Sequence, residues 1–209
     1  MKMNTGMLKG AVYALSRYYV SGDYAKNFES KEVADIVVNH SAAAGISAMA
    51  AGVLPGVGAI LATGVAVGAI WTMYFRIAKY LNLHMGKGTW KAIASAVLTN
   101  IVTQLAGILA LELAVGFIPG ASILAAGVVN FGVTYAAGVI FLKALTGIFA
   151  DGKDPRKMGD EEMNSYFSNA AGNVNAKDVF KEAKGVFKEM KKDGSLKEKE
   201  SIRILRNKY

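Results

Sequence analysis

Two long stretches of this chain carry almost no charge, and they restrict how it can fold more than any other feature. No Asp, Glu, Lys or Arg occurs from Ile36 to Phe75, and from Ala92 to Leu142 the only charged residue is Glu112. A lipid bilayer tolerates uncharged stretches of this length, whereas helices that face water rarely contain them. The sequence therefore indicates a membrane environment for both stretches.

The two stretches look like copies of one unit. Each is interrupted near its middle by the same kind of turn, Gly52-Val53-Leu54-Pro55-Gly56 in the first and Gly116-Phe117-Ile118-Pro119-Gly120 in the second. Proline disfavours helix at the residue before it and suits the start of a following helix. Each unit is therefore predicted to be a helix, a tight turn at Pro55-Gly56 or Pro119-Gly120, and a second helix.

We expect an all-α fold of two repeated helical hairpins, that is, four long apolar helices joined by Pro-Gly turns. The helices are predicted near residues 33–53, 57–84, 89–116 and 121–149, because the stretches lack the alternation typical of strands. The predicted organisation is an N-terminal amphipathic helix in residues 1–32, a double-hairpin membrane domain in residues 33–149, and a basic cytoplasmic tail with an amphipathic helix in residues 150–209.

The charged residues flank the two stretches. The chain has 24 Lys and Arg against 16 Asp and Glu, and residues 76–91 contain basic residues but no acid. An excess of Lys and Arg marks the cytoplasmic side of a membrane, so we expect a cell inner-membrane protein with both termini in the cytoplasm. The arms of the first hairpin, about 17–18 residues or about 26 Å each, are marginal for a bilayer, so either all four helices span it or both hairpins dip in from one side. No nucleic-acid-binding motif accompanies the basic charge, so no nucleic acid partner is expected.

The chain lacks the residue patterns that catalysis or metal binding usually requires. It has no cysteine, and its two histidines, His40 and His84, have no paired carboxylates nearby in the sequence. The segment Gly86-Lys87-Gly88-Thr89 has Gly where a phosphate-binding loop needs Ser or Thr. We therefore expect a protein that is not an enzyme and that binds no cofactor and no metal.

One carboxylic acid and three side-chain amides lie inside the second stretch. Glu112 would cost about 2.5–3.5 kcal/mol at the centre of a membrane helix, so it should face a protein interior, a polar cavity or a partner. Asn100 and Gln104 precede it on the same predicted helix, and Asn130 lies on the next one. They form either a polar path for an ion or proton, or an interhelical hydrogen-bond cluster that fixes packing, and we favour the second.

Two further sets of residues are candidates for contacts. Small residues let membrane helices approach closely, so the helix-packing positions are predicted to be Gly64, Gly68, Gly132 and Gly138, within one chain or between chains of a homo-oligomer. In the tail, an apolar stripe including Phe180 and Phe187 lies beside Lys181, Lys184 and Lys188. This pattern predicts either a helix that binds an anionic lipid surface or a partner, or an amphipathic helix packed on the protein itself.

Several motifs match a known family. They are Pro55-Gly56-Val57-Gly58, then Arg76-Ile77-Ala78-Lys79-Tyr80-Leu81, and then Pro119-Gly120 followed by Val129-Asn130 and Thr134-Tyr135-Ala136-Ala137-Gly138. Over residues 33–149 the chain resembles a bacterial helical membrane domain of unknown function, found in YcjF-like inner-membrane proteins and C-terminal to Era-like GTPase domains. The resemblance implies a membrane-associated helical module that serves a GTPase. Because this chain shows no nucleotide-binding motif, such a GTPase is expected to act in trans.

These observations predict a non-enzymatic helical-hairpin protein embedded in the lipid bilayer. It would act as a self-associating scaffold or dock a cytoplasmic protein through its tail. Two alternatives remain open. One is a pore-forming or transport module that uses Glu112, and the other is a soluble α-bundle that binds an apolar ligand or inserts into membranes like a toxin hairpin.

Overall fold

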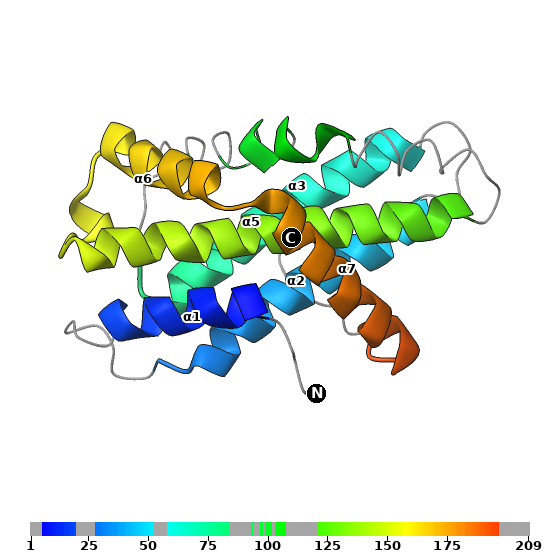
Figure 1. Cartoon of the computed structure of the whole chain (residues 1–209), viewed down its shortest axis with the longest axis horizontal. Coiled ribbons are helices and arrows are strands. Elements are labelled where there is room, and N and C mark those ends of the chain that lie inside the picture. The colour runs from blue at the N-terminus through cyan, green and yellow to red at the C-terminus, as the bar shows by residue number, and fades with distance from the viewer. Residues whose placement is uncertain are drawn as a thin grey trace.

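All regular elements that the structure describes are helices (Figure 1). The computed structural model describes residues 6–19, 28–51, 58–83, 93, 97, 99–101, 103–107 and 121–196, with the backbone only at 51, 58–65, 121 and 122. The elements are α1 (Gly6–Tyr19), α2 (Ser30–Ala51), α3 (Gly58–Tyr80), α5 (Ala121–Ala150), the 3-10 helix η1 (Pro155–Lys157), α6 (Asp160–Asn173) and α7 (Ala176–Lys192). The described residues between 93 and 107 are also helical. The expected all-α class is therefore confirmed.

Three of the predicted apolar helices correspond to α2, α3 and α5, with ends that differ from the prediction by a few residues. The predicted helix at 89–116 is described only between residues 93 and 107. Among the predicted turn and polar residues, five lie outside the described part of the chain: Pro55, Gly56, Glu112, Pro119 and Gly120. The Pro-Gly turns and the double-hairpin arrangement therefore remain predictions.

The other helices pack around α5, which runs along the middle of the molecule (Figure 1). It contacts α1, α2, α3, α6 and α7, and every residue from Asn130 to Leu142 is buried. Because an α-helix turns once every 3.6 residues, burial of such a run means that α5 is covered on all sides. A helix that is apolar around its whole circumference belongs in a protein interior or in a membrane.

Three of the helices that pack on α5, namely α1, α6 and α7, are amphipathic. The buried residues of α1 are Leu8, Ala11, Val12, Leu15 and Tyr19. The buried apolar residues of α7 are Ala176, Val179, Phe180, Ala183, Val186, Phe187 and Met190. On α6 the buried residues are Met163, Phe167 and Ala171. These residues form one hydrophobic cluster with α2, α3 and α5, so the N-terminal segment and the tail share the core of the central domain.

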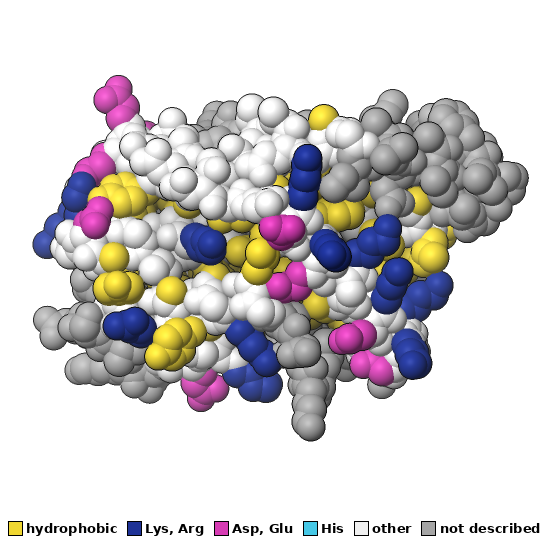
Figure 2. All heavy atoms as spheres, viewed as in Figure 1, with side chains coloured by type: hydrophobic (Ala, Val, Ile, Leu, Met, Phe, Trp, Pro, Cys, Tyr) yellow, Lys and Arg dark blue, Asp and Glu magenta, His cyan; other side chains and the backbone are white. Residues whose placement is uncertain are grey.

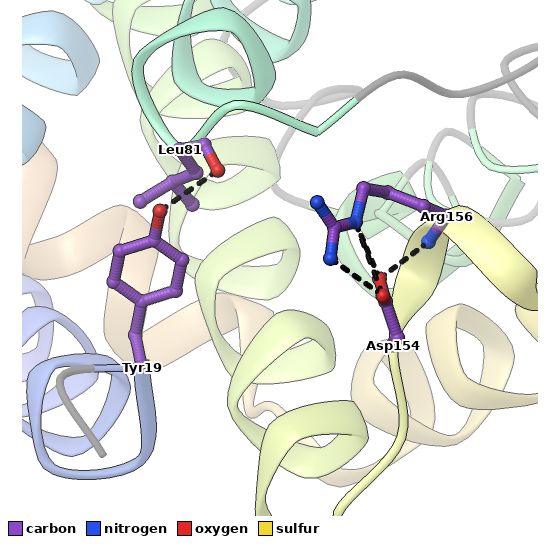
Figure 3. A network of polar contacts seen from close by, with 4 residues as sticks. All are labelled: Tyr19, Leu81, Asp154 and Arg156. Carbon is purple, nitrogen blue, oxygen red and sulfur yellow. Dashed lines mark hydrogen bonds and ion pairs between the residues drawn. The ribbon is translucent and has the colours of Figure 1, made fainter. Parts of the chain in front are cut away.

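Figure 3 shows two polar contacts, one between the ends of α1 and α3 and one local to the turn that follows α5. The Tyr19 hydroxyl donates to the Leu81 carbonyl at 2.8 Å and joins the ends of α1 and α3. Asp154 accepts from the Arg156 backbone N–H at 3.0 Å and from the Arg156 guanidinium at 2.7–3.1 Å. The side-chain hydrogen bond from Arg156 lowers the pKa of the Asp154 carboxyl, because it stabilises the charged form.

Glycines of α5 allow neighbouring helices to lie against its backbone. At Gly138 an added Cβ would lie 2.6 Å from Val37 Cγ1 of α2 and 3.2 Å from Met73 Sδ of α3. At Gly132 it would overlap the ring of Phe180. The structure thus places both glycines in close contacts, although the neighbour of Gly132 is the tail helix α7 instead of another apolar helix.

Two other glycines, Gly127 and Gly68, contrast with each other in how closely they are packed. Gly127 of α5 meets Gly45 of α2, where an added Cβ on Gly45 would lie 3.0 Å from the Gly127 carbonyl oxygen. At Gly68 no atom of the described chain lies within 4 Å of the Cβ position. The close helix contact predicted at Gly68 is therefore not observed in the described structure. Gly64 lies in α3, where only the backbone is described.

Replacing Gly138 with alanine should lower the free energy of unfolding by about 1–3 kcal/mol. The new methyl group would have to displace Val37, whose β-branched side chain has little rotamer freedom in a helix. The control Gly68→Ala should raise the free energy of unfolding by about 0.5–1 kcal/mol, because alanine favours the helix and meets no described atom. Urea denaturation followed by circular dichroism measures both. Equal effects of the two substitutions would contradict the tight contact between α2 and α5.

Candidate functional site

A single carboxylate links three helices, α1, α5 and α7. Glu182 of α7 accepts hydrogen bonds from the backbone N–H groups of Met7 at 2.8 Å and Leu8 at 3.3 Å, at the start of α1. It also accepts from the hydroxyl of Tyr135 on α5 at 2.7 Å. These four residues, Glu182, Met7, Leu8 and Tyr135, are called the Glu182 cluster below.

The Glu182 cluster satisfies groups that would otherwise lack partners. The first N–H groups of a helix have no acceptor within that helix, and this end of the helix carries partial positive charge. Glu182 supplies a negative acceptor there from another helix. Tyr135 is fully buried, so its hydroxyl also needs a partner. Separating α7 from α5 would remove the acceptor from both Tyr135 and the start of α1.

Sequence reasoning did not identify Glu182. It is one of three acids on α7, with Asp178 and Glu189, and nothing near it in the sequence separates it from them. Its partners lie 47 residues away in Tyr135 and 175 residues away in Met7. The one available signal is its place beside Phe180 and Ala183, at the edge of the apolar stripe.

Gln104 binds backbone groups of α6 and of the start of α7, and Asn100 bonds to Gln104. Gln104 Nε2 donates to the Ala171 carbonyl at 3.1 Å and to Asn100 Oδ1 at 2.6 Å, and Gln104 Oε1 accepts from the Ala176 N–H at 2.9 Å. Gln104 and Asn100 therefore form hydrogen bonds of the interhelical kind that the sequence favoured, and the partners of Gln104 in other helices belong to the tail helices α6 and α7. A side-chain amide both donates and accepts, and the end of α6 and the start of α7 offer backbone groups of both kinds.

Asn130 lies in the interior of α5. Its Nδ2 donates to the Ala126 carbonyl at 3.0 Å, one turn earlier, and its Oδ1 has no hydrogen-bond partner within the described ranges. Thr134, one turn later, is fully buried, and its hydroxyl also has no partner there. His40 of α2 is buried as well, with Nδ1 2.7 Å from the Ile36 carbonyl. Asn130, predicted as a polar residue inside the membrane domain, therefore bonds to its own helix.

Phe180 and Phe187 are buried against α5. The ring of Phe180 lies over Gly132, and the ring of Phe187 packs edge-on against Phe131 with 5.3 Å between ring centroids. This corrects the interpretation of the two aromatic residues as a membrane or partner surface, because protein already occupies the apolar stripe of α7. The other interpretation, a helix packed on the protein itself, describes the observed contacts. Of the three predicted surface lysines, Lys181 and Lys188 are exposed and Lys184 is partly buried.

Within the described residues, two helices are long and apolar enough to cross a membrane, judged by length and composition. They are Ser30–Ala50 in α2 and Ile123–Ala150 in α5. In the most apolar windows of these helices, 72% and 78% of the residues are buried inside the protein. Core helices of soluble proteins share these properties, so they agree with membrane association without requiring it.

Comparisons with family models, curated protein sequences and solved structures found no match. The resemblance to the YcjF-like domain therefore stays a prediction that rests on the quoted motifs. In the part of the chain that the structure describes, no group of three or more His, Asp or Glu residues is placed to hold a metal ion. Function has to be argued from the geometry of this chain itself.

Removing the charge of Glu182 should loosen α1. Glu182→Gln weakens charge-assisted hydrogen bonds to Met7, Leu8 and Tyr135, so the free energy of unfolding should fall by about 1.5–3 kcal/mol. Hydrogen exchange at the amides of Met7 and Leu8 should become faster. The control Glu189→Gln changes an exposed acid on the same helix and should leave both quantities unchanged. An unchanged exchange rate in Glu182→Gln would contradict the cluster.

The Gln104 contacts predict a second, separate effect. Gln104→Ala leaves the Ala176 N–H and the Ala171 carbonyl without their side-chain partner, which should lower the free energy of unfolding by about 1–3 kcal/mol. Thr103→Ala is the matched control, because Thr103 is exposed and its hydroxyl bonds only one turn back, to the Thr99 carbonyl. Thermal unfolding of both variants measures the difference. Similar melting temperatures would argue against this contact.

Proposed function

We propose that this protein is a non-enzymatic, membrane-associating helical module that keeps α5 covered in water and releases it into lipid on contact with a bilayer. The observation that carries the proposal is the environment of α5. This helix is long and apolar enough to cross a membrane, yet α1, α6 and α7 enclose it with their apolar sides and turn polar sides outward. Of the alternatives drawn from the sequence, this geometry favours the bundle that inserts like a toxin hairpin.

A permanently spanning α5 fits the geometry less well. The candidate span runs from Ile123 to Ala150, and α7 crosses it near the middle, at Gly132 and Tyr135. If α5 spanned a bilayer in this conformation, the exposed lysines of α7 would lie at hydrocarbon depth. Each would cost roughly 2.5–3.5 kcal/mol. The described arrangement therefore suits water or a membrane surface, and spanning requires the covering helices to move off α5.

The surface of the described residues supports the same proposal. The large hydrophobic side chains exposed there are Tyr13, Tyr18, Phe75 and Leu124. On the face drawn in Figure 2, apolar side chains form separate spots among charged and polar ones. A protein embedded through α5 would need a continuous apolar band about 30 Å tall.

The proposal also bears on the expected membrane surface, on the expected partners and on the possible pore. The excess of Lys and Arg points to the cytoplasmic face of the inner membrane as the surface that the protein meets. Self-association and a GTPase partner in trans stay predictions. A pore that uses Glu112 also stays a prediction, because Glu112 lies outside the described residues.

The test measures, by thiol labelling, whether a buried position of α6 becomes exposed. Such labelling is specific because the chain has no native cysteine. Ala171→Cys introduces a thiol at a fully buried position of α6, and Gly172→Cys introduces one at its exposed neighbour. In water the first thiol should react slowly with a hydrophilic maleimide and the second rapidly. After incubation with lipid vesicles, the first should react at least about tenfold faster, because α6 carries acidic residues and remains in water when α5 enters lipid.

Two results would contradict the proposal. One is a failure of the wild-type protein to bind any vesicle. The other is binding that resists carbonate washing while the Ala171→Cys thiol stays protected, because α5 would then have entered lipid without losing its cover. Constant labelling of Gly172→Cys provides the control for general effects of vesicles on the reaction.

A further inference from the structure

The helix α7 carries a surface that its packing on α5 does not use. Its lysines, spaced three or four residues apart and therefore on one side of the helix, are Lys177, Lys181, Lys184, Lys188 and Lys191, with Lys192 beside the last. These six residues are called the lysine row. The acids Asp178, Glu182 and Glu189 follow their own spacing of four and seven and lie on a different side.

The three sides of α7 have separate roles. The apolar side packs on α5, and the acidic side includes Glu182, which binds the start of α1. In Figure 2 dark-blue side chains line one flank of α7 and magenta side chains line the other. All members of the lysine row except the partly buried Lys184 are exposed. One flank of the helix is thus a basic strip along its whole length.

We propose that the lysine row binds the anionic headgroups of a lipid bilayer while α7 is still packed on α5. This inference rests on the proposed membrane association and adds its first step, a docking that depends on charge alone. Because α5 occupies the apolar side of α7, docking buries no apolar side chain of α7 in lipid. The attachment should therefore be weakened by salt, since the Debye length is only about 10 Å at 0.1 M.

The composition of α7 favours lipid over nucleic acid or an acidic peptide. Arginine is the residue that recognises phosphate or carboxylate groups in a bidentate geometry, and α7 contains none. Single-stranded nucleic acids need exposed aromatic rings for stacking, and both aromatic residues of α7, Phe180 and Phe187, are buried. A row of compact point charges instead suits a fluid array of headgroups, which imposes no fixed geometry.

The experiment compares two variants that lose the same charge. Lys177→Gln, Lys181→Gln and Lys188→Gln together remove exposed members of the lysine row. Lys79→Gln, Lys143→Gln and Lys157→Gln together remove three exposed lysines outside α7. Binding is measured immediately after mixing, before carbonate-resistant insertion develops. The signal is energy transfer from the two native tryptophans to a fluorescent lipid, in vesicles of phosphatidylcholine with and without phosphatidylglycerol.

A lysine near an anionic surface contributes about fivefold in affinity, so the row variant should bind anionic vesicles about a hundredfold more weakly than wild type. The variant outside α7 should remain close to wild type, and high salt should release the early complex of the wild-type protein. Urea denaturation of both triple variants shows whether each is folded. If the row variant is unfolded, the single change Lys188→Gln, with about a fivefold loss, takes its place.

Each of the other outcomes would contradict one part of the proposed docking. Equal losses in the two triple variants would mean that net charge acts and not the row. Equal early binding to vesicles with and without phosphatidylglycerol, or binding that salt does not release, would overturn charge-based docking and leave the proposed function standing. Binding of single-stranded RNA that the row variant loses, without any vesicle binding, would overturn both and assign the surface to nucleic acid.

Discussion

The structure depends on one constraint, which is that the central part of α5, residues 130–142, has no side suited to water. A helix that is apolar around its circumference gains stability only where protein or lipid surrounds it completely. In the described fold protein does this along residues 130–142, where α1, α2, α3, α6 and α7 enclose α5. The polar surface of the molecule is therefore supplied mainly by helices that flank the uncharged stretches in sequence.

Close packing determines how well α5 is covered. At Gly127 the close groups come from α2, at Gly132 from α7, and at Gly138 from both α2 and α3. A methyl group at any of these positions would meet another atom at contact distance or less. Glycine weakens a helix in water, so three such positions on one helix indicate that contact was favoured over intrinsic helix stability. The same small residues also reduce the apolar surface of α5 itself. That reduction makes the helix easier to keep in water.

The helices could be predicted from sequence because their signals are local. Uncharged runs bounded by basic residues placed α2, α3 and α5. The environment of these helices could not be predicted in the same way. Phe180 on α7 packs on Gly132, and Gln104 binds Ala176, across separations that no local pattern encodes. The sequence of an apolar run is the same whether lipid or a later amphipathic helix covers it. Only the three-dimensional contacts therefore show which of the two surrounds the helix.

The order of the helices along the chain has a consequence for the newly made protein. The ribosome releases α5 before α6 and α7, and the start of α1 receives its acceptor from Glu182, which comes 175 residues after Met7. The 42 residues from Asp151 to Lys192 take roughly 2–8 s to synthesise at about 5–20 residues per second. For that interval α5 exists without α6 and α7, although α1, α2 and α3 have already been made. During that interval the contacts of α6 and α7 with α5 do not yet exist, so entry of α5 into lipid, as proposed above, would not have to break them.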